Sequence, residues 1–400
     1  MKSVYYFLSI PVIVLLCTAM AYRYCSSEEK KFIMFSGRNH YVYGRYEYKD
    51  DYVSFSNSGS SITFGTSTPD VSVLIESLSE PTNPNLNWLL VLVNDSCHTK
   101  FSLKPGKHSY ALDLPSTKSN TWTITLVKIT ESHIGRVNCY GFEIPEKESG
   151  MEFRPMVTYW GKEYYDKNTI IQFIGNSITC GYGNMLSIAP PPNGTPLTGF
   201  HSENENAYMS YAMQTARNLR AIPMLVSFSG KGMYRNFDSD TNETMPKIYD
   251  RIHLQDSVSA IWEGDPVRET ATSLIVINLG TNDYFGESRN EHLNDAVFVK
   301  TYIKFVSKII NLYPDSKIIC VNGPMLNNNF PAGKKCWTRI QASIIKVQEH
   351  FYAMGDKRVY TFFFTPQSAP YGEDYHPSLA THTKMAEELT TFIRTVVYKK

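Results

Sequence analysis

Two residues of this 400-residue chain have side chains that could perform catalysis together, Ser177 and His376. A serine hydroxyl attacks a carbonyl carbon when a histidine removes its proton. Backbone or amide N–H groups then stabilise the oxyanion, and Gly230 and Asn282 could supply them. Each signal is weak alone, because serine, glycine and asparagine are ordinary turn residues and a histidine before a proline is commonly structural. The four residues therefore matter only if the fold brings them together.

Three of the four residues follow predicted strands. Short apolar runs at 170–174, 224–228 and 274–279 predict strands, and Ser177, Gly230 and Asn282 come directly after them. His376 precedes a helical pattern at 379–398. In open parallel sheets, ligands bind beyond the carboxyl ends of the strands. The spacing therefore predicts that these loops meet at one edge of a sheet.

The C-terminal half alternates strand and helix patterns throughout. Further strands are expected at 317–321 and 359–364, and helices at 207–219, 295–312, 340–351 and 379–398. Strands that alternate with helices indicate a parallel sheet wrapped by helices. We predict an α/β domain over 169–400, a linker over 151–168, and no internal repeat.

The N-terminal half has a different pattern. Short β-branched or aromatic runs occur at 53–55, 61–64, 71–75, 88–93 and 121–127, and clusters of Asn, Gly, Pro and Ser separate them. Several short strands at close spacing, with no helical period, predict a β-sandwich or jelly roll. We place this all-β domain at 22–150.

Together the four loops resemble the blocks of the SGNH (GDSL-type) hydrolases, which carry Ser, Gly, Asn and His in this chain order. The segments GNSITCGYGN (175–184), SGKGMYRN (229–236) and VINLGTNDYF (276–285) are similar to those of carbohydrate esterase family 2. So are ENAYMSY (205–211), SGR (36–38), VLVNDS (91–96), TLVKITES (125–132) and GFEI (141–144). The resemblance covers almost the whole chain after residue 21. It implies an SGNH-type three-layer α/β/α domain preceded by a jelly-roll domain.

The resemblance also implies roles for single residues. Ser177 would be the nucleophile, and His376 the general base and acid. The N–H groups of Ser177 and Gly230 and the side chain of Asn282 would form the oxyanion hole. Asp374 matches the family's acidic position two residues before the histidine, but Glu373 or a backbone carbonyl could orient His376 instead. The implied reaction is two-step removal of O-acetyl groups from a carbohydrate, with no metal or cofactor.

One position departs from the family pattern. The family usually has Gly-Asp-Ser at the nucleophile, whereas this chain has Asn176 before Ser177. Losing that charge removes charge-assisted hydrogen bonds, which puts the rate in doubt more than the reaction class. Cys180 belongs to the family pattern and is expected to be a packing residue. Two alternatives stay open: an SGNH lipase or thioesterase acting on longer acyl chains, and a carbohydrate-binding cell-surface module whose site has decayed.

Aromatic residues near the four loops are candidates for sugar contacts, because an aromatic ring can stack on a sugar ring. The chain has 27 tyrosines and 13% aromatic residues. Trp337, which lies in a loop-rich stretch, and Tyr284, which lies beside Asn282, are the preferred candidates, and Tyr182 is a third. Core packing is the competing interpretation for each of them, and a Tyr-rich β domain would raise the same count.

Charge and the N-terminal segment limit the partners. The net charge is +1, from 39 Lys and Arg against 38 Asp and Glu, so no basic surplus points to nucleic acid. Residues 1–21 combine a lysine, an apolar run and Ala19-Met20-Ala21, which is typical of a cleaved signal peptide. An uncleaved anchor is the alternative, although Pro11 interrupts the run. We expect a secreted protein with no membrane contact after cleavage. Nothing in the sequence indicates its oligomeric state.

Cysteines and sequons suggest modifications typical of secreted proteins. Cys97 with Cys139, and Cys320 with Cys336, are candidate disulfides because each pair lies within one predicted domain, and free buried thiols are the alternative. The remaining cysteines beyond residue 21 are Cys25 and Cys180. Asparagines of N-x-[ST] sequons, which would mark surface loops in a eukaryotic protein, stand at Asn94, Asn193 and Asn242.

Overall fold

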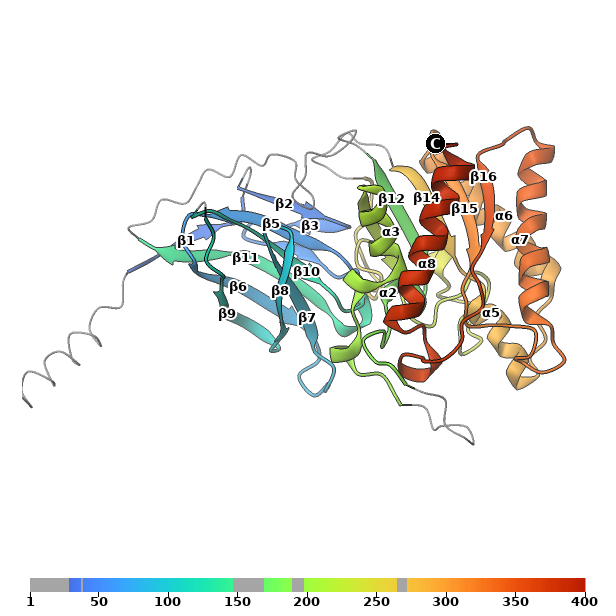
Figure 1. Cartoon of the computed structure of the whole chain (residues 1–400), viewed down its shortest axis with the longest axis horizontal. Helices are drawn as coiled ribbons and strands as arrows, with labels where there is room; N and C mark the ends of the chain where they lie inside the picture. Colours follow the sequence, from blue (N-terminus) through green and yellow to red (C-terminus); the bar gives the residue numbers. More distant parts are fainter. Residues whose placement is uncertain are drawn as a thin grey trace, which may run out of the picture.

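The structure is a computed structural model that describes residues 29–36, 39–118, 120–146, 169–188, 198–264 and 272–399. An antiparallel β domain and a parallel α/β domain lie side by side along the long axis (Figure 1). This arrangement confirms the predicted fold class. The signal peptide at 1–21, Cys25, Asn193 and the linker at 151–168 lie outside the described residues, so those assignments and the domain boundaries stay predictions.

The β domain is a sandwich of two antiparallel sheets. The first has the order β3-β4-β11-β6-β9, with β1 also paired to β11, and the second has the order β2-β5-β10-β7-β8. The strands of the first sheet are β1 (Lys30–Met34), β3 (Tyr46–Tyr48), β4 (Val53–Phe55), β6 (Asp70–Leu78), β9 (Gly106–Asp113) and β11 (Arg136–Pro145). Those of the second are β2 (His40–Tyr43), β5 (Ser61–Thr66), β7 (Asn87–Val93), β8 (Ser96–Leu103) and β10 (Trp122–Lys128).

Strand β7 shows how the sequence specifies both faces of the second sheet. Side chains alternate along a strand, so Leu89 and Val91 point into the core of the sandwich. Leu90 and Leu92 point the other way and pack in a second cluster with helical residues of the α/β domain, such as Met213. The strand is apolar at nearly every position because both of its faces are covered. The second sheet is therefore also the docking surface between the two domains.

The α/β domain has a five-stranded parallel sheet in the order β13-β12-β14-β15-β16. Its core clusters place α3 and α8 on one face and α6 and α7 on the other, as Figure 1 shows. The strands are β12 (Ile170–Gly175), β13 (Ile222–Ser227), β14 (Thr272–Asn278), β15 (Lys317–Asn322) and β16 (Val359–Phe363). The α-helices are α2 (Ser177–Cys180), α3 (Tyr211–Leu219), α4 (Met245–Ile248), α5 (Thr281–Phe285), α6 (Asp295–Leu312), α7 (Cys336–Ala353) and α8 (Leu379–Phe392).

Shorter turns connect these elements. The helix predicted at 207–219 is interrupted at Ser210, whose extended backbone (ψ 158°) separates a 3₁₀ turn from α3. The helix predicted at 379–398 ends its α-helical part at Phe392 and continues as one π-helical turn. The 3₁₀ turns are η1 (Ser132–Ile134), η2 (Ser202–Asn204), η3 (Ala207–Met209), η4 (Gly286–Arg289) and η5 (Glu373–Tyr375), and the π-helical turn is η6 (Ile393–Val397).

Polar contacts supplement the apolar docking surface. Arg45 of the β domain is fully buried, lies 4.6 Å above the Tyr249 ring, and donates to the carbonyls of Tyr249 and Arg251. The carbonyl of Ile129 accepts a hydrogen bond from the Ala207 N–H at 2.9 Å. The interface therefore combines the apolar packing of a protein interior with buried hydrogen bonds, unlike a transient contact.

The predicted disulfides are wrong. Cys97, Cys139, Cys320 and Cys336 are free thiols, and all but Cys97 are buried. Cys139 packs in the sandwich core, whereas Cys97 is exposed on β8, so the two side chains lie in different environments and do not pair. The sequon residues Asn94 and Asn242 are exposed, and their glycosylation stays a prediction.

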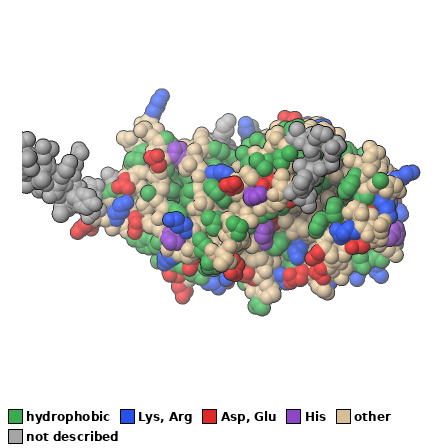
Figure 2. Space-filling view, turned by 90° about the horizontal axis from the view of Figure 1, so that it is seen from below, with side chains coloured by type: hydrophobic (Ala, Val, Ile, Leu, Met, Phe, Trp, Pro, Cys, Tyr) green, Lys and Arg blue, Asp and Glu red, His purple; other side chains and the backbone are tan. Residues whose placement is uncertain are grey.

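The distribution of charge on the surface agrees with the composition. Figure 2 shows acidic and basic side chains interspersed over one face of the molecule, consistent with the net charge of +1. Within the described part of the chain, no helix combines the length and the apolar character that crossing a membrane requires.

We expect Arg45→Leu to lower the free energy of unfolding by about 2–5 kcal/mol, because it leaves one buried and one partly buried carbonyl without their charged donor. Arg136 is the matched control, since its ion pair with Asp256 at 3.5 Å is partly exposed. Arg136→Leu should cost less than about 1 kcal/mol. Urea denaturation followed by tryptophan fluorescence measures both, and equal losses would contradict a special role of Arg45 in the interface.

Candidate active site

The loops that carry the predicted site leave the parallel sheet at one level. Gly175 at the end of β12 is in register with Ser227 of β13 and Asn278 of β14. The strand order reverses direction around β12 and β14, and such a switch point is where open α/β sheets bind ligands. The loops that contain Ser177, Gly230 and Asn282 therefore start from one edge, as the sequence predicted.

Asn176 fixes the position of Ser177. Its side-chain oxygen accepts a hydrogen bond from the Ile178 N–H at 3.1 Å and caps the short helix α2. Ser177 is the first residue of this helix, and no described residue accepts its backbone N–H. The buried side-chain NH₂ of Asn176 also has no partner among the described residues. Asn176 therefore caps α2, and its side-chain NH₂ remains an unsatisfied donor among the described residues.

Ser177 and His376 form a hydrogen-bonded pair. The Oγ of Ser177 lies 2.8 Å from Nε2 of His376. Nδ1 of His376 lies 3.0 Å from the backbone carbonyl oxygen of Glu373, which can only accept, so Nδ1 carries the proton. This leaves the lone pair of Nε2 directed at the serine hydroxyl. Desolvation by the surrounding protein lowers the pKa of His376 to about 4, which keeps the imidazole neutral near pH 7.

The carboxylate of Asp374 does not orient His376, contrary to the leading prediction. It accepts hydrogen bonds from the Tyr182 hydroxyl at 2.7 Å, from the Gly199 N–H at 2.9 Å and from the Thr198 hydroxyl at 3.1 Å. Of the three alternatives that the sequence left open, the backbone carbonyl, that of Glu373, contacts the imidazole.

The Glu373 carboxylate is also directed elsewhere. It is fully buried and contacts Asn204 Nδ2 at 2.7 Å, His201 Nδ1 at 2.9 Å and the His201 N–H at 3.1 Å. These bonds hold the backbone of the loop that contains His376 against the segment around His201 and Asn204. Glu373 therefore contributes to the pair through its main chain, while its side chain anchors the loop.

Asp374 acts on His376 through Tyr182. The Tyr182 ring stacks on the imidazole, with centroids 4.1 Å apart and an interplanar angle of 22°. Asp374 and Tyr375 have positive φ angles of 48° and 61°, a backbone conformation that residues other than glycine rarely adopt. The hydrogen bonds of Asp374 hold this strained turn. Tyr182, predicted as a sugar contact, supports the histidine in the structure.

The other two loops are tied to each other. The side-chain NH₂ of Asn282 donates to the Lys231 carbonyl at 2.9 Å, which leaves its second N–H for another acceptor. Asp283 is buried and accepts the N–H groups of Met233, Tyr234 and Arg235 at 2.6–2.9 Å. Gly230 has a φ of 77°, and no described residue accepts its N–H. The loops thus present N–H groups that have no partner within the described protein.

Tyr284 is wrongly predicted as a sugar contact. Its ring is 0% exposed in the core, and its hydroxyl contacts Ser343 at 2.9 Å and donates to Asp295 at 3.1 Å. Trp337 is partly exposed at the start of α7, and its buried Nε1 has no partner among the described residues. Trp337 therefore stays a candidate, and Tyr284 does not.

The structure places two aromatic residues that the sequence did not single out, Phe237 and Phe330, against Phe285. Phe237, which is 47% exposed, stacks on Phe285 with centroids 4.7 Å apart, and Phe330, which is 46% exposed, lies 6.2 Å from Phe285. The Phe237 N–H donates to the Gly230 carbonyl at 2.7 Å, so the group adjoins the predicted oxyanion loop. Phe237 follows SGKGMYRN directly, and that position was the available signal.

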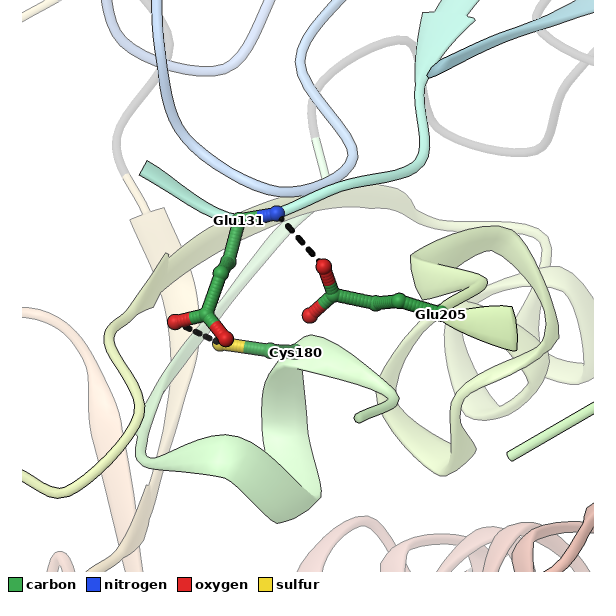
Figure 3. A group of neighbouring side chains, drawn as sticks. All are labelled: Glu131, Cys180 and Glu205. Atoms are coloured by element: carbon green, nitrogen blue, oxygen red, sulfur yellow. Dashed lines mark hydrogen bonds between the residues drawn. The ribbon is translucent and has the colours of Figure 1, made fainter. Parts of the chain in front are cut away.

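A buried group of ionisable residues also escaped the sequence analysis. Glu131, Cys180 and Glu205 are all buried, and their ligand atoms lie within 4.8 Å of one another (Figure 3). Both oxygens of Glu131 already accept hydrogen bonds from Ser229, and Nζ of Lys128 lies 2.9 Å from the Glu131 carbonyl. Because Ser229 already occupies both carboxylate oxygens of Glu131, the group makes a poor metal site and we assign no metal to it. The three residues come from separate segments, which no spacing rule connects.

Comparisons with known proteins agree with the two-domain architecture. The sequence model of the GDSL-like Lipase/Acylhydrolase family matches residues 173–384, and that of the Carbohydrate esterase 2 N-terminal domain matches residues 42–152. A solved structure of a family two carbohydrate esterase from Clostridium thermocellum in complex with cellohexaose has a TM-score of 0.75 and 28% identity. The match covers 90% of this chain and 100% of that one.

Two curated proteins are also similar. The cellulase/esterase CelE of Acetivibrio thermocellus is 31% identical over 356 residues, which is 88% of this chain and 39% of that protein. This chain therefore spans about two fifths of the length of that relative. An acetylxylan esterase / glucomannan deacetylase of Cellvibrio japonicus is 24% identical over 85% of this chain and 86% of that protein.

The carbonyl-oriented histidine predicts a mild effect of Asp374→Asn. The amide keeps an acceptor for the Tyr182 hydroxyl, so we expect kcat for p-nitrophenyl acetate to fall by less than about 10-fold. Loss of a carboxylate that orients the histidine directly costs about 10,000-fold. Steady-state kinetics decide between the two, and a fall near the larger figure would contradict the observed partner of Nδ1.

The lowered pKa of His376 predicts activity at acidic pH. A general base works when neutral, so kcat/KM should stay constant as the pH falls and then drop through an apparent pKa near 4. The Asp374 charge raises the pKa of His376, so Asp374→Asn should move this drop to lower pH. A pH–rate profile checks both, and an acid limb centred near 6.5 would contradict the desolvated imidazole.

Proposed function

This chain belongs to the GDSL-like Lipase/Acylhydrolase family and carries the N-terminal domain of carbohydrate esterase family 2, and on that premise we propose that it is a serine esterase that removes O-acetyl groups from a carbohydrate. The observation that carries the proposal is the 2.8 Å contact between Ser177 Oγ and His376 Nε2. A neutral imidazole with a free Nε2 lone pair is the group that activates a serine hydroxyl.

The proposed reaction has two steps. Ser177 Oγ attacks the acetyl carbonyl carbon, and its proton passes to Nε2 of His376. The oxyanion accepts hydrogen bonds from the N–H groups of Ser177 and Gly230 and from Asn282 Nδ2, each worth about 2.7–4 kcal/mol in comparable sites. His376 then protonates the leaving sugar oxygen, which leaves an acetyl-serine. Water attacks this ester, His376 takes its proton, and acetate departs as Ser177 recovers the proton.

The proposed substrate is an acetylated polysaccharide or oligosaccharide outside the cell. The similar proteins bear the names acetylxylan esterase, glucomannan deacetylase and cellulase/esterase, and one solved relative holds cellohexaose. Phe237 and Phe285 offer partly exposed aromatic surface on the loops next to Gly230 and Asn282, on which a sugar could stack. The signal-like segment at 1–21 supports secretion.

We expect Ser177→Ala to reduce acetate release from acetylated xylan by at least about 1,000-fold, because it removes the only atom that becomes acetylated. Ser109 is a matched control, since it is an exposed serine on β9 of the β domain. Ser109→Ala should retain full activity. Unchanged acetate release by Ser177→Ala would disprove the proposed nucleophile, whereas no acetate release by the wild-type chain would leave a carbohydrate-binding role.

The chain length of the acyl group distinguishes an acetyl esterase from a lipase. We expect p-nitrophenyl acetate to be hydrolysed with a higher kcat/KM than p-nitrophenyl octanoate. A preference for the octanoate ester would identify the protein as a lipase or thioesterase.

A further inference from the structure

One carboxylate of the β domain reaches the oxyanion loop of the α/β domain. Glu131 is fully buried, and its two side-chain oxygens accept hydrogen bonds from both donors of Ser229: the backbone N–H at 2.7 Å and the hydroxyl. Ser229 immediately precedes Gly230, whose N–H is the proposed second oxyanion donor. Hydrogen bonds to an ionised carboxylate are about twice as strong as neutral ones. This clamp therefore restrains the backbone next to Gly230.

The same carboxylate contacts the nucleophile helix. The thiol of Cys180, one turn after Ser177 in α2, lies 3.8 Å from Glu131 Oε2 (Figure 3). Burial raises the pKa of Cys180 well above its usual value, so the group is a neutral thiol donor. Glu131 thus touches both of the elements that present backbone N–H groups to the proposed oxyanion.

Three groups hold Glu131 itself. Glu205 Oε2 accepts the Glu131 N–H at 2.9 Å, Lys128 Nζ donates to the Glu131 carbonyl at 2.9 Å, and His133 Nδ1 lies 3.2 Å from Oε2. Burial disfavours its charge, but His133 and Ser229 outweigh burial and lower the pKa of Glu131 to about 2. Burial and the Glu131 charge raise the pKa of Glu205 well above its usual range, so Glu205 stays neutral. The cluster therefore keeps its negative charge on the residue that holds Ser229.

We propose that Glu131 is a positioning residue of the esterase site: from the β domain it sets the Ser229-Gly230 turn and the α2 terminus so that their N–H groups point at the same oxyanion. This inference rests on the proposed function. Glu131 does not touch the substrate, and it acts through Ser229 and Cys180. The β domain would then take part in acyl transfer in addition to any role in binding carbohydrate.

The test uses the full chain and p-nitrophenyl acetate, with kcat expressed per site titrated by a serine-reactive phosphonate. Glu131→Gln keeps the side-chain volume but loses the charge and one acceptor. We expect kcat to fall by about 10- to 100-fold and KM to stay nearly unchanged. The loss should be smaller than that from removing an oxyanion N–H donor completely, because the donor is only displaced. Glu76 is the matched control, because its carboxylate accepts hydrogen bonds from Asn138 and Tyr140 within the β domain. Glu76→Gln should keep the wild-type kcat.

A double-mutant cycle separates positioning from general stability. If Glu131 acts through Ser229, the two losses should not add. The kcat of the double variant Glu131→Gln/Ser229→Ala should then lie within about 2-fold of that of Glu131→Gln. Ser229→Ala alone keeps the backbone bond and should lose less, about 3- to 10-fold, and it provides a test should Glu131→Gln fail to fold. The Glu131 charge also raises the pKa of His376, so the acid limb of Glu131→Gln should move to lower pH.

Three results would overturn the proposal: a wild-type kcat per titrated site in Glu131→Gln, additive losses in the double variant, or a change in KM alone. A fourth is a bound metal ion, shown by elemental analysis, whose chelation reproduces the variant's loss. Failure of the proposed function is distinct, since it would appear either as no ester hydrolysis by the wild-type chain or as ester hydrolysis that survives Ser177→Ala.

Discussion

The in-register parallel pairing of β12 with β13 and β14 is the constraint on which the rest of the site depends. It brings Gly175, Ser227 and Asn278 into one row, so three loops begin from a common rigid edge. Short bonds between the loops then complete the arrangement, such as those from Asn282 to Lys231 and from the Arg235 N–H to Asp283. The positions of the proposed catalytic groups are thus set by the sheet and refined by side chains. A site built on strand ends is held more closely than one built on free loops.

The carboxylates around the histidine are all directed away from it. Asp374 holds a strained turn, Glu373 anchors the loop beneath, and Glu131 holds the neighbouring loop. The imidazole contacts a neutral carbonyl instead, which fixes its tautomer without contributing a full charge. Desolvation then dominates and lowers the pKa of His376. The surrounding charges act at longer range, where they favour the imidazolium that the proposed reaction would form.

The sequence predicted the architecture and the central pair because both depend on local pattern. The helix Asp295–Leu312 matches its predicted bounds, and the order of the four loops placed Ser177 with His376. The group that orients His376 could not be predicted from the sequence. The Asp374 carboxylate binds Tyr182 and Gly199 instead of His376, and only the fold brings these distant residues to it. Tyr284 was misjudged for the same reason: it lies two residues after Asn282 in the chain, but its hydroxyl finds partners in the core. Strands β8 and β9 of the β domain were not predicted. Most of their residues are exposed or half-buried, so they lack the apolar pattern that indicates a strand.

The apolar outer face of β7 has a consequence for the evolution of this architecture. Leu90 and Leu92 would face water if the β domain stood alone, and an exposed apolar strand surface favours aggregation. We therefore expect the two halves to be inherited together rather than exchanged separately, as tethered binding modules are. The similar segment of CelE spans both halves in one alignment of 356 residues, although CelE itself is much longer. In larger multidomain proteins, this pair of domains would be transferred as one indivisible unit.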